Sequence, residues 1–168
     1  TQSGVLAAPM TYAIDGEQYV ALLVGWGGVM DVSGGKLVGE MTPNISRLMV
    51  FKLGGTAKLP PLAPSAERVL DPPPPSGSSM QLTAGEKAYT NSCSVCHGAG
   101  AVAGALNPDL RHSAVLGDAK AWRSIVHDGV LAANGMVGWK GQFSPEQVEA
   151  IRMYVIQRAN EDKALEKR

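Results

Sequence analysis

The chain has no net charge, few aromatic residues and almost no cysteine. Its 15 Lys and Arg balance 15 Asp and Glu, aromatic residues make up 5% of 168 residues, and two cysteines are present. A neutral chain gives no electrostatic attraction to a polyanion, so nucleic acid and an anionic membrane surface are not indicated as partners. The apolar share of 45% still permits a packed core. The length suits one ordinary domain, or a small domain plus part of another.

Long apolar segments are also lacking. The longest, Tyr19 to Met30, is interrupted by three glycines and is too short to cross a bilayer. No signal peptide is recognisable at Thr1, where the sequence instead resembles the approach to a β-strand. We therefore expect a fragment of a longer protein, with any export signal upstream of it.

Both cysteines stand in one motif, Cys93-Ser94-Val95-Cys96-His97. This is C-x-x-C-H, in which two thiols form thioether bonds to the vinyl groups of a haem and the histidine binds its iron. A disulfide across so short a loop would constrain little. A zinc site would need a second ligand pair, and a thioredoxin-like pair does not need the histidine. The motif predicts a covalent haem c on Cys93 and Cys96, with His97 as an axial ligand.

A haem that transfers electrons usually has a second axial ligand, and four later residues are candidates: His112, His127, Met136 and Met153. Met153 fits helix packing, and His127 fits the end of a helix, where an imidazole complements the helix dipole. His112 follows His97 too closely for the chain to round the haem edge. Met136 lies in a glycine-containing loop that can approach a porphyrin closely, and we predict it as the sixth ligand. A thioether ligand raises the reduction potential.

The other nitrogen of a ligating histidine usually donates a hydrogen bond to a carbonyl, which orients the ring. The turn Asn107-Pro108-Asp109-Leu110 lies at a suitable distance from His97. The carbonyl of Pro108 is therefore a candidate acceptor from His97. A plain loop turn explains this spacing equally well.

Residues 1–56 have the pattern of β-structure. Ala8–Ile14 and Gln18–Val24 flank a turn at Asp15-Gly16-Glu17, and Arg47–Leu53 is a third strand candidate. The strands carry apolar residues on both faces, which suits burial on two sides. We expect them to belong to a larger β-structure, because three such strands cannot cover themselves. A small self-contained β-subdomain is the alternative.

Residues 57–79 are rich in proline, including Pro72 to Pro75, and predict a semi-rigid linker. Within it, Ser65–Leu70 could form a helical turn or a docking segment.

Residues 80–168 have the pattern of helices. The expected boundaries are a capping box at Thr83–Glu86, a helix Ala119–His127 capped by Asp118, a second capping box at Ser144–Gln147, a helix from there to about Asn160, and a frayed tail Glu161–Arg168. Val148, Ile151, Val155 and Ala159 share the buried face of the last helix.

Residues 80–168 also resemble class I cytochromes c. The likeness is carried by Gly85 and Tyr89 ahead of the Cys93–His97 motif, then by Pro108, Met136, Ile151 and Tyr154. In that family the first and last helices cross at such a glycine, with an aromatic residue beside it. The resemblance implies an all-α haem domain in which Gly85 and Tyr89 contact Ile151 and Tyr154.

The N-terminal segments are similar to the last blade of a quinoprotein dehydrogenase propeller. They are Ala8–Tyr12, Gln18–Ala21, Gly25–Gly28 and Ser46–Gly55. Last-blade strands, a proline-rich linker and a haem domain, in this order, resemble the quinohaemoprotein alcohol dehydrogenases. In that family an eight-bladed propeller holds pyrroloquinoline quinone (PQQ) and Ca²⁺ and oxidises an alcohol to an aldehyde or ketone. The electrons then pass singly to the haem.

The resemblance implies that most quinone ligands, the Ca²⁺ ligands and the catalytic base lie outside this chain. Only Gly25 and Trp26 match a position near the quinone, and a buried turn aromatic is the competing explanation for Trp26. A periplasmic location follows from the haem chemistry. The expected partners are the PQQ propeller and an electron acceptor such as a copper protein, a cytochrome or a quinone. A free-standing mono-haem carrier is the alternative function, and a haem-based sensor a more remote one.

Overall fold

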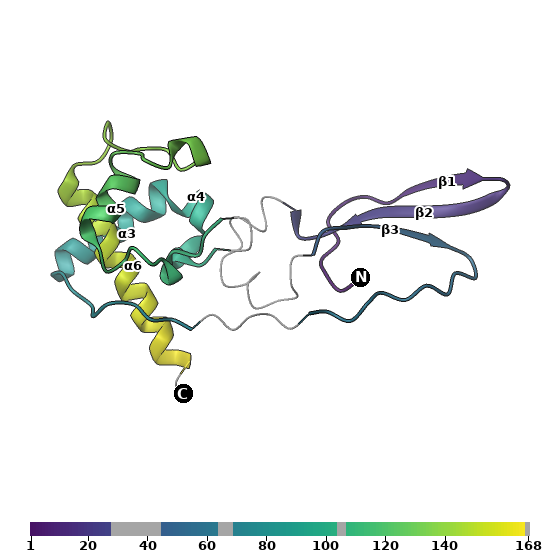
Figure 1. The fold of residues 1–168 in the computed structure, drawn as a ribbon, viewed down its shortest axis with the longest axis horizontal. Helices are drawn as coiled ribbons and strands as arrows, with labels where there is room; N and C mark the ends of the chain where they lie inside the picture. The colour runs from purple at the N-terminus through teal and green to yellow at the C-terminus, as the bar shows by residue number, and fades with distance from the viewer. Residues whose placement is uncertain (28–44, 64–68, 104–106, 167–168) are drawn as a thin grey trace.

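The computed structural model describes residues 1–27, 45–63, 69–103 and 107–166. It contains a three-stranded sheet and, separate from it, a group of helices (Figure 1). We call these the sheet lobe and the helical lobe. Among the described residues, none of the helices combines the length and the hydropathy needed to span a membrane.

The sheet lobe is an antiparallel sheet in the order β1-β2-β3, formed by Met10–Ile14, Glu17–Val24 and Arg47–Lys52. The hairpin between β1 and β2 turns at Asp15 and Gly16, whose φ angles are 53° and 80°. Two successive positive φ angles are those of a type I′ turn, which Asp-Gly favours. The predicted hairpin and third strand are confirmed. The strand ends differ from the prediction by one or two residues.

Among the described residues, both faces of this sheet carry exposed apolar side chains, although Ala21 and Val24 of β2 are buried. Leu23 and Leu48 lie opposite each other on one face and are 61% and 62% exposed. Val20 and Phe51 pair on the other face and are also exposed. Exposed apolar groups on both faces of a sheet indicate surfaces that another layer would normally cover.

The helical lobe contains α3 (Ser79–Ser92), α4 (Ser94–His97), α5 (Ala119–Val126) and α6 (Pro145–Glu166). Short 3₁₀ turns lie at Ala99–Ala101 (η1), Leu110–His112 (η2) and Ala132–Asn134 (η3). Helices α3 and α6 cross at Gly85, where an added Cβ would lie 2.0 Å from the carbonyl oxygen of Ala150. The rings of Tyr89 and Tyr154 meet beside the crossing, with centroids 5.3 Å apart. The expected crossing is confirmed.

Two of the predicted helix caps are present in the structure, and one predicted cap lies at a different position. Asp118 caps α5 by accepting hydrogen bonds from the N–H groups of Lys120 and Ala121. Ser144 and Gln147 bond each other reciprocally, as a capping box does. The capping box predicted at Thr83–Glu86 is wrong, because Ser78 and Gln81 form the box and α3 begins at Ser79. Thr83 lies inside the helix.

Helix α6 extends beyond its predicted end. It continues to Glu166, and its predicted inner face is buried. Asp162, expected in a frayed tail, is buried and accepts a hydrogen bond from Arg111 at 2.9 Å. A long-range ion pair in the last turns holds this part of the helix against the lobe, so the prediction of a frayed tail from Glu161 is wrong for the described residues.

The second half of the proline-rich segment packs against α6. We call residues 69–77 the α6 strap. Asn160 donates to the carbonyl of Pro73 and Lys163 pairs with Asp71, both at 2.9 Å. Gly77 lies against the sulfur of Met153. Leu70 is only 1% exposed. The strap therefore belongs to the helical lobe.

The start of the same segment contacts the sheet lobe, where Gln2 donates to the carbonyl of Pro60 at 2.9 Å. Residues 61–68 lie between this contact and the strap. Most of the segment Ser65–Leu70, predicted as a turn or docking element, falls outside the described residues. Its last residue, Leu70, is described and is buried.

The strap generates a stability prediction. Leu70→Ala should lower the unfolding free energy of the helical lobe by about 2 to 4 kcal/mol, because it removes a fully buried side chain. Val69→Ala is the matched control, since Val69 is exposed. Urea unfolding followed by the circular dichroism of the helices measures both. Equal midpoints for the two variants would show that the strap does not support the lobe.

Candidate haem-binding site

The cysteine motif occupies one helical turn at the end of α3. Cys93 ends α3, and its carbonyl accepts from the N–H groups of Cys96 and His97 at 3.1 and 2.9 Å. Cys93 is buried and Cys96 is exposed, and both are free thiols. Residues three apart on a helical turn lie on similar sides of it, so the two thiols can reach the same ligand.

The environment of Cys93 does not favour a redox pair. Burial, together with the nearby Cys96, raises the pKa of the Cys93 thiol to about 11. A reactive cysteine needs a lowered pKa so that the thiolate forms near neutral pH. A raised thiol pKa therefore argues against thiol–disulfide exchange at this pair.

The ring of His97 is held in one orientation. His97 is 8% exposed, and its Nδ1 lies 2.9 Å from the carbonyl oxygen of Pro108. A carbonyl can only accept, so Nδ1 is the donor in this contact. In a neutral ring Nε2 is then the nitrogen that has a lone pair for a metal. This is the contact that the turn at Pro108 suggested.

The hydroxyl of Tyr89 contacts the C-terminal end of the same motif. Its oxygen lies 3.0 Å from the carbonyl oxygen of His97 and 2.8 Å from that of Gly98, so the hydroxyl can donate a hydrogen bond to either one. Tyr89 is fully buried at the crossing of α3 and α6. Sequence reasoning used Tyr89 only for packing and missed this role. The only signal in the sequence for this contact was the position of the tyrosine, eight residues before His97.

Met136 lies in a loop whose base is closed by backbone hydrogen bonds. Trp139 N–H donates to the carbonyl of Val126 and Lys140 N–H to that of His127, at 2.9 and 3.0 Å. Next to these two hydrogen bonds, Gly138 lies so close to Gly129 that a Cβ added to Gly138 would be 2.9 Å from the Cα of Gly129. These contacts restrict where the loop can carry Met136.

Met136 and the cysteine motif also share a core. Met136 is half-buried and packs against the cluster that includes Cys93 and Tyr89. Around the two segments several apolar side chains are exposed, namely Val95, Val130, Leu131 and Val137. Exposed apolar groups beside a thiol pair, an imidazole and a thioether fit the chemistry of an apolar macrocycle that carries iron. The described residues therefore fit a haem.

The other candidate ligands have different surroundings. His127 caps the end of α5, is buried, and its Nδ1 lies 2.7 Å from a carboxylate oxygen of Asp128. Met153 packs against Gly77 of the α6 strap. His112 ends the short turn η2. The hydrogen bond at Nδ1 of His127 does not by itself separate it from His97, and Met136 is favoured because it packs against the cluster that contains Cys93.

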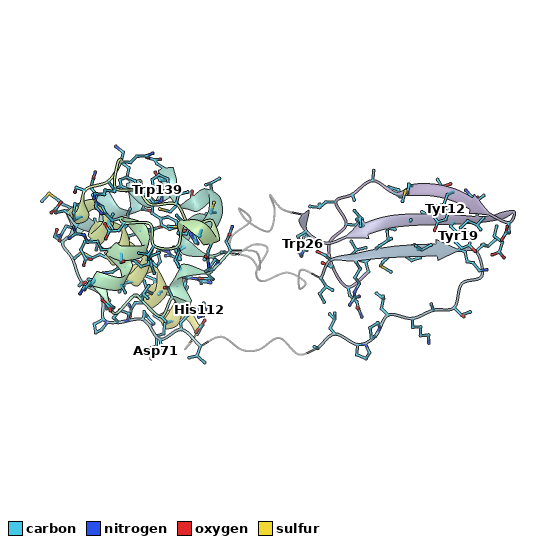
Figure 2. All side chains as sticks on the ribbon, turned by 45° about the horizontal axis from the view of Figure 1, so that its top comes forward. Tyr12, Tyr19, Trp26, Asp71, His112 and Trp139 are labelled. Carbon is cyan, nitrogen blue, oxygen red and sulfur yellow. The ribbon has the colours of Figure 1, made fainter. Side chains whose placement is uncertain are left out.

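Gly25 and Trp26 belong to the sheet lobe, as Figure 2 shows for Trp26. Gly25 N–H donates to the carbonyl of Gly4 at 2.7 Å. An added Cβ on Gly4 would lie 2.5 Å from the ring of Trp26, so the indole packs directly on that glycine. Packing of this kind is what the competing explanation for Trp26 expects. Proximity of these residues to a quinone stays a prediction.

The buried Tyr89 generates a pH prediction. Burial raises the pKa of Tyr89 far above its ordinary value of 10.0, because the neutral phenol is favoured in the folded state. In the unfolded chain this tyrosine ionises from about pH 10 upward, so that its contribution to stability falls there. Tyr89→Phe cannot ionise. It should be less stable than the parent by about 1 to 2 kcal/mol at pH 7, since it loses a buried donor.

Unfolding free energies measured from pH 7 to pH 11 test this. The gap between parent and Tyr89→Phe should narrow above pH 10. Curves that stay parallel over the whole range would contradict the protonated, donating role of Tyr89.

The family model matches the helical lobe, whereas the similar proteins match nearly the whole chain. Residues 80–155 match the family model described as cytochrome C oxidase, cbb3-type, subunit III. Over 165 residues the chain is 44% identical to the quinohemoprotein alcohol dehydrogenase ADH IIB of Pseudomonas putida, covering 96% of this chain and 24% of that protein. It is 37% identical over 162 residues to the dehydrogenase subunit of an alcohol dehydrogenase (quinone) of Acetobacter aceti, covering 95% and 22%.

A solved structure agrees along nearly the whole chain. The quinohemoprotein alcohol dehydrogenase ADHIIG of Pseudomonas putida HK5 superposes with a TM-score of 0.79 at 38% identity. The match covers 99% of this chain and 24% of that one. The chain thus spans about a quarter of the length of the proteins it resembles, and both lobes take part in the match.

Proposed function

We propose that this chain receives electrons inside a quinohaemoprotein alcohol dehydrogenase, because nearly its whole length is similar to the C-terminal part of such enzymes, including their cytochrome c domain. The complete protein would oxidise an alcohol to an aldehyde or ketone with PQQ, and the helical lobe would take the electrons one at a time on a covalent haem c. The observation that carries the proposal is the fixed His97 ring beside the two thiols, in one core with Met136.

Four residues would hold the haem. Cys93 and Cys96 would form the two thioether bonds, while His97 Nε2 and Met136 Sδ would be the axial ligands of the iron. Such a haem supplies a one-electron acceptor, and its thioether ligand favours a high reduction potential. The chain's own contribution is orientation: Pro108 fixes the tautomer of His97, and Tyr89 holds the carbonyl end of the motif.

The sheet lobe would be the end of a larger β-structure. Its exposed apolar side chains support this, since neighbouring blades of a propeller would pack against both faces. PQQ and Ca²⁺ would be held mainly by that propeller, with Gly25 and Trp26 near the quinone. The relatives are about four times as long as this chain, which leaves room for a propeller.

The connection between the lobes would keep the haem close to the propeller. Only residues 61–68 lie between the contact of Pro60 with Gln2 and the α6 strap. A fully extended chain of that length spans at most roughly 30 Å. A tether this short raises the effective concentration of one lobe at the other, so docking is intramolecular. A periplasmic location, with a copper protein, a cytochrome or a quinone as final acceptor, completes the proposal.

Reduction of the haem by alcohol tests this function. In the complete protein loaded with PQQ and Ca²⁺, ethanol or 1-butanol should reduce the haem without an added carrier, as followed by visible absorbance in a stopped-flow instrument. Inserting about twenty Gly/Ser residues within 61–68 should slow that reduction, because it dilutes the tethered lobe. Oxidation of the same alcohol by an artificial quinone acceptor should stay unchanged.

The matched control carries the same Gly/Ser run after Arg168, where it does not lengthen the tether. It should reduce the haem at the parent rate. If alcohol turns over with the artificial acceptor but never reduces the haem, the proposed electron transfer from the quinone to this haem is wrong. If the complete, cofactor-loaded protein oxidises no alcohol with either acceptor, a free-standing electron carrier replaces the dehydrogenase function.

A further inference from the structure

The hydrogen bond between His97 and Pro108 needs a support that Pro108 itself does not provide. Proline has no N–H, so the backbone of Pro108 cannot be anchored by donating a hydrogen bond. The next residue, Asp109, is buried and accepts from the backbone N–H and the Nε of Arg111, both at 3.0 Å. The side chain of Arg111 thereby closes the turn that begins at Pro108.

The same arginine connects this turn to α6. One guanidinium nitrogen of Arg111 donates to Asp162 at 2.9 Å, across 51 residues of sequence. Asp162 also accepts from Arg158 at 3.2 Å, one turn earlier on α6. Arg158 also pairs with Glu161, so the network links three carboxylates to two guanidinium groups.

Helix α6 is also the element against which α3 is fixed. The backbone of Gly85 lies against Ala150 of α6, and α3 leads directly into the turn that carries His97. The donor and the acceptor of the His97–Pro108 hydrogen bond are thus held to one helix from two sides. A shift of the Pro108 turn along α6 would lengthen that bond.

We propose that Arg111 and Asp162 are positioning residues for the axial histidine. Their ion pair holds the Pro108 carbonyl at hydrogen-bond distance from His97 and so tunes the imidazole as an iron ligand. The inference rests on the proposed haem function, but names residues that neither attach the haem nor bind its iron. A hydrogen bond donated by Nδ1 makes the imidazole a stronger donor to a metal. Stronger donation stabilises oxidised iron, and weakening the bond therefore raises the reduction potential.

A charge-neutral double variant tests the proposal in the haem-loaded chain. Arg111→Gln with Asp162→Asn removes one positive and one negative charge, so that the net charge near the haem is unchanged. We expect a higher midpoint potential than in the parent. We also expect the His97 Nδ1 proton to exchange with solvent up to about tenfold faster by NMR, as for the loss of a hydrogen bond between neutral groups.

The matched control is Asp71→Asn with Lys163→Gln. This pair is also neutral and also joins α6 to another segment, but it does not touch the Pro108 turn. Its potential and exchange rate should equal those of the parent. Arg111→Lys is the milder variant if the double variant does not fold. It keeps the charge but cannot bridge both carboxylates with a rigid fork, so a smaller rise is expected.

Two results would overturn the proposal. The first is a folded double variant, or a folded Arg111→Lys, with the potential and exchange rate of the parent. The second is an equal rise in the control. Neither affects the reduction of the haem by alcohol, so the proposed function would stand. If the parent chain carries no covalent haem, both the proposed function and the positioning role of Arg111 and Asp162 are wrong.

Discussion

The close approach of α3 to α6 at Gly85 is the constraint on which the helical lobe depends. Any side chain at this position would collide with the backbone of Ala150, so only glycine allows the two helices to meet here. The crossing brings Tyr89 against Tyr154, and from there its hydroxyl reaches the carbonyls of His97 and Gly98. Helix packing therefore sets the position of the turn that would carry the haem.

Helix α6 serves as the common frame of the lobe. It receives α3 at Gly85, the Pro108 turn through Arg111 and Asp162, and the strap through Asn160 and Lys163. His97 and its hydrogen-bond acceptor come from different segments, and both are fixed relative to this one helix. If His97 binds a haem iron as proposed, such an arrangement would limit movement around the iron and so favour electron transfer, because little reorganisation would be needed.

Local signals in the sequence predicted the parts of the fold that depend on short spacings. The Asp15-Gly16 turn, the caps at Asp118 and Ser144 and the cysteine motif all act within a few residues, and each is present. The start of α3 was misplaced because two capping boxes, at Ser78 and at Thr83, fit the same stretch. Only the upstream box is used.

Other features depend on partners that are far apart in the chain. The ion pair of Arg111 with Asp162 spans 51 residues, and nothing in its spacing distinguishes it from surface charges. Leu70 follows several prolines and reads as part of a linker, although its side chain is buried. The hydrogen bonding of the Tyr89 hydroxyl is equally hard to predict, since packing alone already explains an aromatic residue there. Such contacts become visible only once the helices are placed.

The central claim is that one chain supplies His97 nitrogen and Met136 sulfur to a covalently bound haem iron. X-ray absorption at the iron edge of the oxidised, haem-loaded chain tests it directly, because sulfur and nitrogen neighbours scatter differently and at different distances. The account predicts one sulfur neighbour, with nitrogen in every other position. A spectrum fitted by nitrogen alone, or by an oxygen from water in place of sulfur, would contradict it.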